Sequence, residues 1–481
     1  MLYSWVAAIA LFGRGGVARA QQLTPPDADA RVPPAVRPGE GLFIGPFVFS
    51  PSIEVMTLYD NNVFKVEDGY DPDGTGQALE QHPEGAGQYN ARAKLALKLP
   101  FSRSYVSLVW QPLYHAYYNL ETPLKTSHQV DLEGHLNFFN GSSLKLSDSY
   151  IDGFFEARRL DVATTYQLSA TPFRRNLIDL DYDWSFAAVW GLSGRFEHIG
   201  YTYDRTEVVN FQDTATGSSS STQRIFDFFD YKTDSIQTRA YRVLSRYKIY
   251  GEGTVSQTDQ DRSNFNESQL EANGCNDPFT SVNPDEILAH EQTCRELEQQ
   301  IDSEHIEEED VSVGILGWVT ALSQADFKIG YSHWTFQNGA NKPFSGVSYT
   351  GSFEHHFTRR TFATLNLRRA PIQASGQYTG YYLFQEAVLT FEHKVTPNLT
   401  GRAEVSFRNS DFPGSEKPFS EAFTLNEIAG LFEMRYRPGT PDRPGPFVFT
   451  VGYAPSRSTS TQPGLDVNSQ RFRVGIQYGW F

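Results

Sequence analysis

The residues with the clearest capacity for chemistry are charged side chains that recur at alternate positions. An acidic series and a basic series each lie on one short stretch of chain: Asp179, Asp181 and Asp183; Arg92, Lys94 and Lys98. Alternate side chains share one face of a β-strand, so each series would line a single face. Separate acidic and basic faces could orient a polar solute by their field. The other interpretation, which we favour, is that they are wall residues neutralised by ion pairs.

A second candidate is the run from Tyr59 to Asn62, which combines an aromatic ring with a carboxylate and two amides. Asp60, Asn61 and Asn62 would end a strand, because such side chains bond the local backbone and tolerate turn conformations. The same oxygens could also hold Ca²⁺, but a turn is the favoured interpretation. Tyr59 suits the aromatic belt at a membrane interface.

The sequence contains no HExxH, GxSxG, Walker or CxxC motif. His355 and His356 are adjacent within an alternating segment, so only one of them can point to a given face and the pair makes a poor metal site. We therefore expect no enzymatic activity, no cofactor and no metal. The net charge of −16 argues against nucleic acid as a partner, because phosphate binding requires clustered Lys and Arg.

Cys275 and Cys294 are the only cysteines, and both lie in residues 259–309. In an exported protein an even pair predicts a disulfide. Closing a loop of about 20 residues would contribute roughly 3 kcal/mol. Asn283 followed by Pro284 is typical of a helix start, so we expect a stapled, partly helical loop. It would serve as a lid, plug or external docking surface, or would only be protected against proteolysis.

The last segment of the chain shows strand alternation most clearly. Five apolar residues alternate with five polar or small ones: Phe472, Val474, Ile476, Tyr478 and Trp480; Arg471, Arg473, Gly475, Gln477 and Gly479. This strand, which ends the chain on Phe481, resembles the C-terminal signal of bacterial outer-membrane barrels. The apolar face would then meet lipid and the polar face a watery lumen. Phe481 is one position out of phase with Trp480, which a bulge or an inward-turned terminus would explain.

Similar segments recur through residues 46–481, joined by connections that alternate between short and long. This pattern predicts an all-β fold, a single transmembrane antiparallel β-barrel of about 18 strands, with residues 152–175 leaving a range of 16–20. A large soluble β-sandwich would also alternate, but the loop asymmetry and the last strand favour the barrel. Besides the two series above, the charged residues expected on the lumen face are Asp131, Glu133, Arg402, Glu404, Glu427, Glu433, Arg435, Arg471 and Arg473.

The N-terminal part is organised differently. Residues 1–20 contain a short apolar run and Ala18-Arg-Ala20, which are typical of a signal peptide and its cleavage site. Residues 21–45 are rich in proline and predict an extended periplasmic segment. Export, short turns on the inside and an even strand count together predict the outer membrane of a Gram-negative bacterium, with both termini in the periplasm.

The first barrel segment, residues 45–64, resembles a bacterial family of outer-membrane β-barrel porins. That family begins its barrel with an apolar run, Pro-Ser, alternation and Tyr-Asp-Asn-Asn before an aliphatic residue and Phe, as at Pro51-Ser52 and Tyr59 to Phe64 here. Its members are associated with exopolysaccharide operons. The resemblance implies an outer-membrane channel, with polysaccharide export as the leading expectation.

Three functions therefore compete at this stage. The first is a conduit for polysaccharide with periplasmic export components as partners, and the second is a general diffusion porin for small polar solutes. The third is a scaffold or surface-binding protein that transports nothing. In each case the expected surroundings are outer-membrane lipid, reached with the help of the barrel-assembly machinery.

Overall fold

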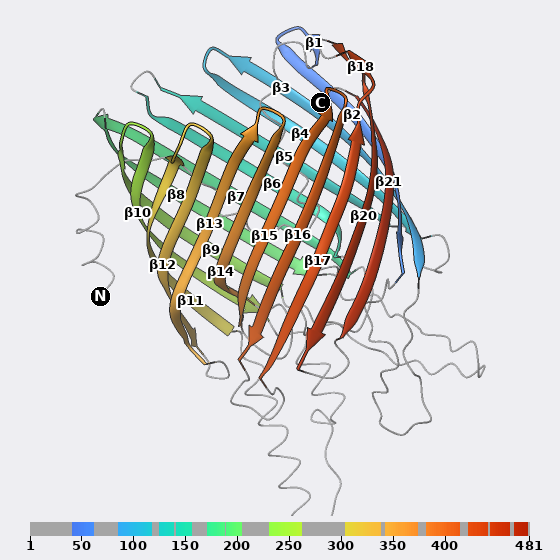
Figure 1. The fold of residues 1–481 in the computed structure, drawn as a ribbon. Helices are drawn as coiled ribbons and strands as arrows, with labels where there is room; N and C mark the ends of the chain where they lie inside the picture. Colours follow the sequence, from blue (N-terminus) through green and yellow to red (C-terminus); the bar gives the residue numbers. More distant parts are fainter. Residues whose placement is uncertain are drawn as a thin grey trace, which may run out of the picture.

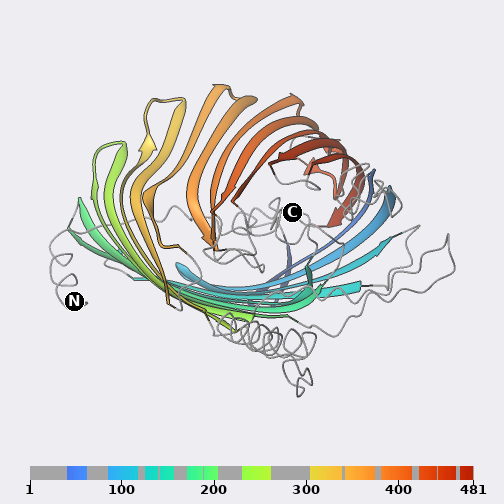
Figure 2. The ribbon, with the colours of Figure 1, turned by 90° about the horizontal axis from the view of Figure 1, so that it is seen from below.

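The computed structural model shows a closed β-barrel (Figures 1 and 2). It describes residues 41–61, 85–117, 125–138, 141–155, 171–187, 189–203, 230–261, 304–337, 342–373, 381–413, 422–440, 443–461 and 466–479. Among these residues, no helix is long and apolar enough to cross a membrane.

The barrel wall consists of long strands of similar length. Its members are β2 (Phe47–Asp60), β3 (Ala86–Phe101), β4 (Ser104–Tyr117), β5 (Lys125–Asn137), β6 (Ser143–Phe155), β7 (Thr171–Ala187), β8 (Trp190–Tyr203), β9 (Asp230–Val243), β10 (Tyr247–Asp261), β11 (Glu304–Trp318), β12 (Ser323–Gln337), β13 (Phe344–Thr358), β14 (Thr361–Gln373), β15 (Tyr381–Thr396), β16 (Leu399–Phe412), β17 (Phe423–Tyr436), β20 (Phe447–Ser460) and β21 (Val467–Gly479).

Each wall strand pairs antiparallel with the next along the chain, and β21 pairs back with β2 to close the ring. The sheet counts 19 strands because β1 (Leu42–Ile44) pairs with the start of β2 as a short hairpin. The remaining 18 strands form the wall, which confirms the predicted antiparallel barrel of about 18 strands. A small ribbon, β18 (Gly439–Thr440) with β19 (Arg443–Pro444), lies between β17 and β20 at the same end as β1 (Figure 1).

Connections alternate in length around the ring, as the sequence predicts. Short turns join β3 to β4, β9 to β10 and β15 to β16, whereas long segments such as 204–229 and 262–303 join the strands at the other end. We call these the short-turn end and the long-loop end. Strands β6 and β7 pair directly, so no further strand stands between them in the wall, which settles the range that residues 152–175 had left open.

Alternation explains why these segments form a barrel. In β21, Phe472, Val474, Ile476 and Tyr478 are exposed on the outer face, while the arginines between them are half-buried. Cross-strand neighbours share a face, so the same alternation repeats through the ring. In a closed ring, the backbone hydrogen-bonding groups of every wall strand are paired with a neighbour on each side, and the apolar exterior suits lipid.

Exposed aromatic rings form a girdle near each end of the outer wall, as membrane barrels require at their two interfaces. At the short-turn end they are Phe101, Phe138, Phe186, Tyr247, Phe357, Tyr436, Phe447 and Tyr478. At the long-loop end they are fewer: Tyr59, Tyr89, Tyr114 and Tyr150.

Several predictions fall on residues outside the described ranges. They are the signal peptide at 1–20, most of the segment at 21–45, Asn62, the cysteines at 275 and 294 with most of the loop at 259–309, and Trp480 with Phe481.

Candidate functional site

The candidate site is the inner wall of the barrel, where charged side chains alternate with the lipid-facing residues. On β3, for example, Ala93 stands opposite the exposed Ile53, whereas Lys94 stands opposite Ser52. The same reasoning places every charged residue that the sequence assigned to the lumen on the face opposite the exposed apolar side chains. The structure joins some of these charged residues through ion-pair partners, such as Arg195 and Arg408, that the sequence did not reveal.

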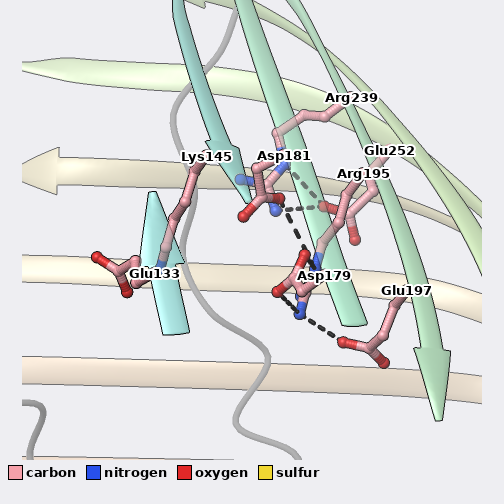
Figure 3. Close-up of polar contacts among 8 residues, drawn as sticks. All are labelled: Glu133, Lys145, Asp179, Asp181, Arg195, Glu197, Arg239 and Glu252. Atoms are coloured by element: carbon pink, nitrogen blue, oxygen red, sulfur yellow. Dashed lines mark hydrogen bonds and ion pairs between the residues drawn. The ribbon is translucent and has the colours of Figure 1, made fainter. Parts of the chain in front are cut away.

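Arg195 on β8 organises the acidic series of β7. Its guanidinium lies 2.7 Å from Asp179 and 3.7 Å from Asp181, and Glu197 on its own strand completes the group at 2.5 Å (Figure 3). Paired strands place these residues side by side, since Asp181 stands opposite Arg195 and Asp179 opposite Glu197. Arg195 thus contacts three carboxylates, and the charge of Arg175 on β7 also acts on Glu197.

Arg239 on β9 and Glu252 on β10 form the most buried pair in the described wall, and the sequence reasoning missed both. They are opposite one another in the ladder, and Nε of Arg239 donates to Oε2 of Glu252 at 2.7 Å. Lys328 on β12 reaches the other oxygen of Glu252 at 2.8 Å. The side chains of the pair are 5% and 2% exposed, so this ion pair is shielded from water.

A third group lies on β15 to β17 and β21. Arg408 bonds Glu386 at 2.7 Å and Glu427 at 3.1 Å, which joins three neighbouring strands. Arg402 lies 2.7 Å from Glu404. Glu433 is paired with Arg435 at 2.5 Å and also with Arg473. These contacts favour the interpretation of the inner charges as a neutralised wall.

The inner wall of β3 to β6 differs in chemistry from the rest. Asp131 on β5 accepts hydrogen bonds from neutral donors: Gln129 at 2.9 Å, Ser149 at 2.7 Å and Gln111 at 3.3 Å. Glu133 lies 3.0 Å from Lys145 (Figure 3). It also accepts a hydrogen bond from the Tyr105 hydroxyl. Amides and hydroxyls are therefore mixed with charges in this sector.

The basic series of β3 lies on this sector's edge. Lys98 places its ammonium 3.9 Å from the centroid of the Tyr105 ring. Arg92 stands opposite Glu54. The negative charge that acts on Lys94 is that of Asp131, which lies two strands away on β5.

The Tyr59 to Asn61 run lies where the first and last wall strands meet. Tyr59 is exposed on the outer wall, as the aromatic-belt interpretation expects. Asp60 is almost fully buried and accepts a hydrogen bond from Ser469, while Oδ1 of Asn61 accepts one from the Gln470 backbone at 2.6 Å. These side chains bond the last strand of the barrel, where the sequence interpretation had them bonding the local backbone. In the described residues, no group of three metal-ligating side chains occurs.

A comparison with family models finds a match over part of the chain. Residues 204–427 match the family described as "Putative beta-barrel porin 2". The match does not include residues 45–64, on which the resemblance was first seen. No curated protein matches the chain.

Several solved structures resemble the chain at low sequence identity. Pseudomonas aeruginosa OccK2 (OpdF) in complex with glucuronate is 10% identical with a TM-score of 0.44, covering 90% of this chain and 98% of its own. Acinetobacter baumannii OccAB3 is 8% identical with a TM-score of 0.42 and the same coverage. P. aeruginosa OpdK is 10% identical with a TM-score of 0.42, again covering 90% and 98%.

The family match confirms the porin resemblance, while the association with exopolysaccharide operons stays a prediction. The closed ring, the apolar exterior with two aromatic girdles and the charged inner wall agree with that match. The chain is a closed 18-stranded antiparallel β-barrel, and its residues 204–427 match the family described as "Putative beta-barrel porin 2".

Proposed function

We propose that this barrel is a passive channel for small polar solutes across the outer membrane. The observation that carries the proposal is the inner wall, whose charged side chains are held against the strands by ion pairs such as Arg408 with Glu386 and Glu427. Side chains fixed in this way line a polar path and do not need a cargo to neutralise them. A barrel of this strand number encloses an aqueous lumen.

The proposed orientation places the short-turn end in the periplasm, with both chain termini there, and the long-loop end outside the cell. Outer-membrane barrels are built in this way. The protein would be inserted by the barrel-assembly machinery and surrounded by lipid along the band between the two girdles. Residues 21–45 would then extend into the periplasm, where they could contact a partner.

A second candidate is a conduit for a secreted polysaccharide. The amides and hydroxyls around Asp131, supplied by Gln111, Gln129 and Ser149, are groups that bind sugar hydroxyls well. The family resemblance points the same way. This candidate requires periplasmic export components as partners, which the diffusion channel does not.

We propose that the protein is not an enzyme. In the described part of the wall, many charged groups are engaged in structural ion pairs such as Arg408 with Glu386, and histidines contact strand neighbours such as Ser323 and Glu354. The role proposed for the barrel needs only a shaped polar path.

The test is single-channel recording of the purified barrel in a planar bilayer. A variant in which a short Gly-Asn-Gly turn replaces residues 262–303 provides the comparison, because Gln260 and Glu304 stand opposite one another and a short turn can join them. Steady conductance of both proteins supports the open channel. Conductance only after the replacement would assign the segment a gating role and favour regulated export. If neither protein conducts, the transport proposals fail and a scaffold role leads.

A matched solute assay separates the two transport candidates. Vesicles that contain the barrel should take up small sugars at rates that fall with solute size. A diffusion channel does so without any partner. A polysaccharide conduit should instead show current blockade by a long polymer, and this blockade should depend on which side the polymer is added.

A further inference from the structure

The inner cations of the described wall fall into two classes. Most are ion-paired: Lys145, Arg195, Arg239, Lys328, Arg402, Arg408, Arg435 and Arg473 each lie within ion-pair distance of a carboxylate. Lys94 belongs to a second group, together with Arg175 and Arg368, whose side chains make no ion pair within the ranges that the structure describes. Its ammonium has no hydrogen bond there either, and the charge that acts on it is that of Asp131 on β5.

The lack of a partner has a cause in the neighbouring strands. The register that pairs Arg92 with Leu113 and Leu95 with Trp110 places Gln111 opposite Lys94, and Gln111 in turn stands opposite Gln129. Both amide nitrogens donate to Asp131. Ser149 donates to it from the other side at 2.7 Å, so neutral donors already occupy the carboxylate that could have neutralised Lys94.

The same bonds prepare the two amides for a hydroxylated ligand. Each glutamine donates through its nitrogen to Asp131, which leaves its carbonyl oxygen as an acceptor for a hydroxyl group. The amides are held in place by the carboxylate, so a ligand would not have to order them. Lys94 supplies a positive charge beside this row of acceptors.

A second lysine continues the site along β3. Lys98 is four residues further on the same face, about 13 Å along the strand. Its ammonium stands over the ring of Tyr105, which is 3.9 Å away at its centroid. A ring of this kind attracts a cation but does not neutralise it. The two lysines therefore present positive charge on the same inner face of β3, beside the amides around Asp131.

We propose that Lys94, with Gln111 and Gln129 beside it, is a binding subsite for the carboxylate of a hydroxyl-rich acidic solute, such as a sugar acid. The ammonium takes the carboxylate and the amide carbonyls accept hydroxyl hydrogen bonds. Lys98 offers a second attraction for the same solute or for the next acidic unit of a chain. This proposal rests on the channel function proposed above and names the class of solute for it.

The test measures binding of galacturonate, with galactose as the uncharged comparison, to the detergent-solubilised barrel by calorimetry. Lys94→Gln should weaken galacturonate binding about tenfold or more, since a hydrogen bond to a charged group is worth roughly 1.4 kcal/mol or above. Lys145→Gln is the matched control, because it removes the same charge from the same sector but from a lysine already paired with Glu133. Lys94→Arg should retain most of the affinity.

The outcomes separate this proposal from the channel function. Equal weakening by Lys94→Gln and Lys145→Gln would show a general field effect and overturn the subsite, as would equal binding of galactose and galacturonate. Conductance in KCl alone tests the channel independently of any sugar. A barrel that conducts but does not bind galacturonate refutes the subsite only, whereas one that binds but does not conduct refutes the channel.

Discussion

Asp60, near the end of the first wall strand, accepts a hydrogen bond at 2.9 Å from Ser469 in the last strand, although the two residues are 409 positions apart in the sequence. Asn61 adds two bonds at the same place: its backbone nitrogen donates to the Gln470 carbonyl at 3.1 Å, and its Oδ1 accepts from the Gln470 nitrogen. The Asp-Asn pair therefore fastens the long-loop end of the seam at which the barrel closes.

Loss of this fastening should destabilise the barrel. Asn61→Ala removes the acceptor of the Gln470 amide, and the expected cost is about 1–2 kcal/mol, the usual value for a lost hydrogen bond whose partner stays behind. The measurement is urea unfolding in lipid vesicles, supported by the heat-induced mobility shift of the folded barrel on a gel. Gln257→Ala, at an exposed position of the same barrel end, is the control. Equal stability of the two variants would contradict the role of Asn61.

A second prediction concerns Gly314 on β11, which lies under the ring of Tyr250. A Cβ at Gly314 would overlap Cζ of that ring, so Gly314→Ala must displace a buried tyrosine whose ring also lies 4.5 Å from the Arg239 guanidinium. We expect a loss of about 1–3 kcal/mol from overpacking. Gly194→Ala, where the added carbon would meet nothing within 4 Å, should be nearly neutral.

The double variant Gly314→Ala with Tyr250→Ala tests the cause. If the ring is the obstacle, the glycine substitution should cost little once the ring is removed, and unfolding free energies of the four proteins give the coupling. Additive losses would mean that the glycine matters for another reason.

The alternation of side chains was enough to predict the wall, because apolar and polar residues alternate within each strand and the pattern can be recognised one strand at a time. Phe472 and Val474 against Arg471 and Arg473 need no knowledge of the neighbours. The loop asymmetry likewise predicted the order of turns, and the ring of 18 strands confirms it.

The ion pairs could not be predicted in the same way. That Arg195 meets Asp179 and Asp181, or that Asp131 is taken by amides so that Lys94 is left unpaired, depends on the register between strands. A shift by one residue would turn each side chain to the other face. The hydrogen bond between Asp60 and Ser469 was still harder to predict. Ser469 lies in the last strand, and only the closure of the barrel brings the two residues together.

A third prediction concerns ion selectivity. Arg195→Gln would leave Asp179, Asp181 and Glu197 without their shared cation on the inner wall. Cations should then be favoured in the channel, and the reversal potential across a KCl gradient should move towards that of potassium. Because surface fields are screened by salt, the shift should shrink at high ionic strength.

The control for this prediction is Arg457→Gln. It removes the same charge from an exposed position on β20. A shift of similar size in that variant would show that net charge alone decides selectivity, and that the cluster around Arg195 does not.

The last prediction separates burial from charge in the pair of Arg239 and Glu252. Arg239→Met deprives a carboxylate with a 2% exposed side chain of its closest cation, and breaking such a buried pair costs about 3 kcal/mol or more. Lys328→Gln removes a cation from the same carboxylate, but its side chain is 24% exposed and Arg239 remains. Its cost should therefore be smaller than that of Arg239→Met, because the buried carboxylate keeps its closest cation. Urea unfolding in lipid vesicles gives both values. If Lys328→Gln proved as costly as Arg239→Met, Glu252 would depend on total positive charge and not on the buried two-strand contact.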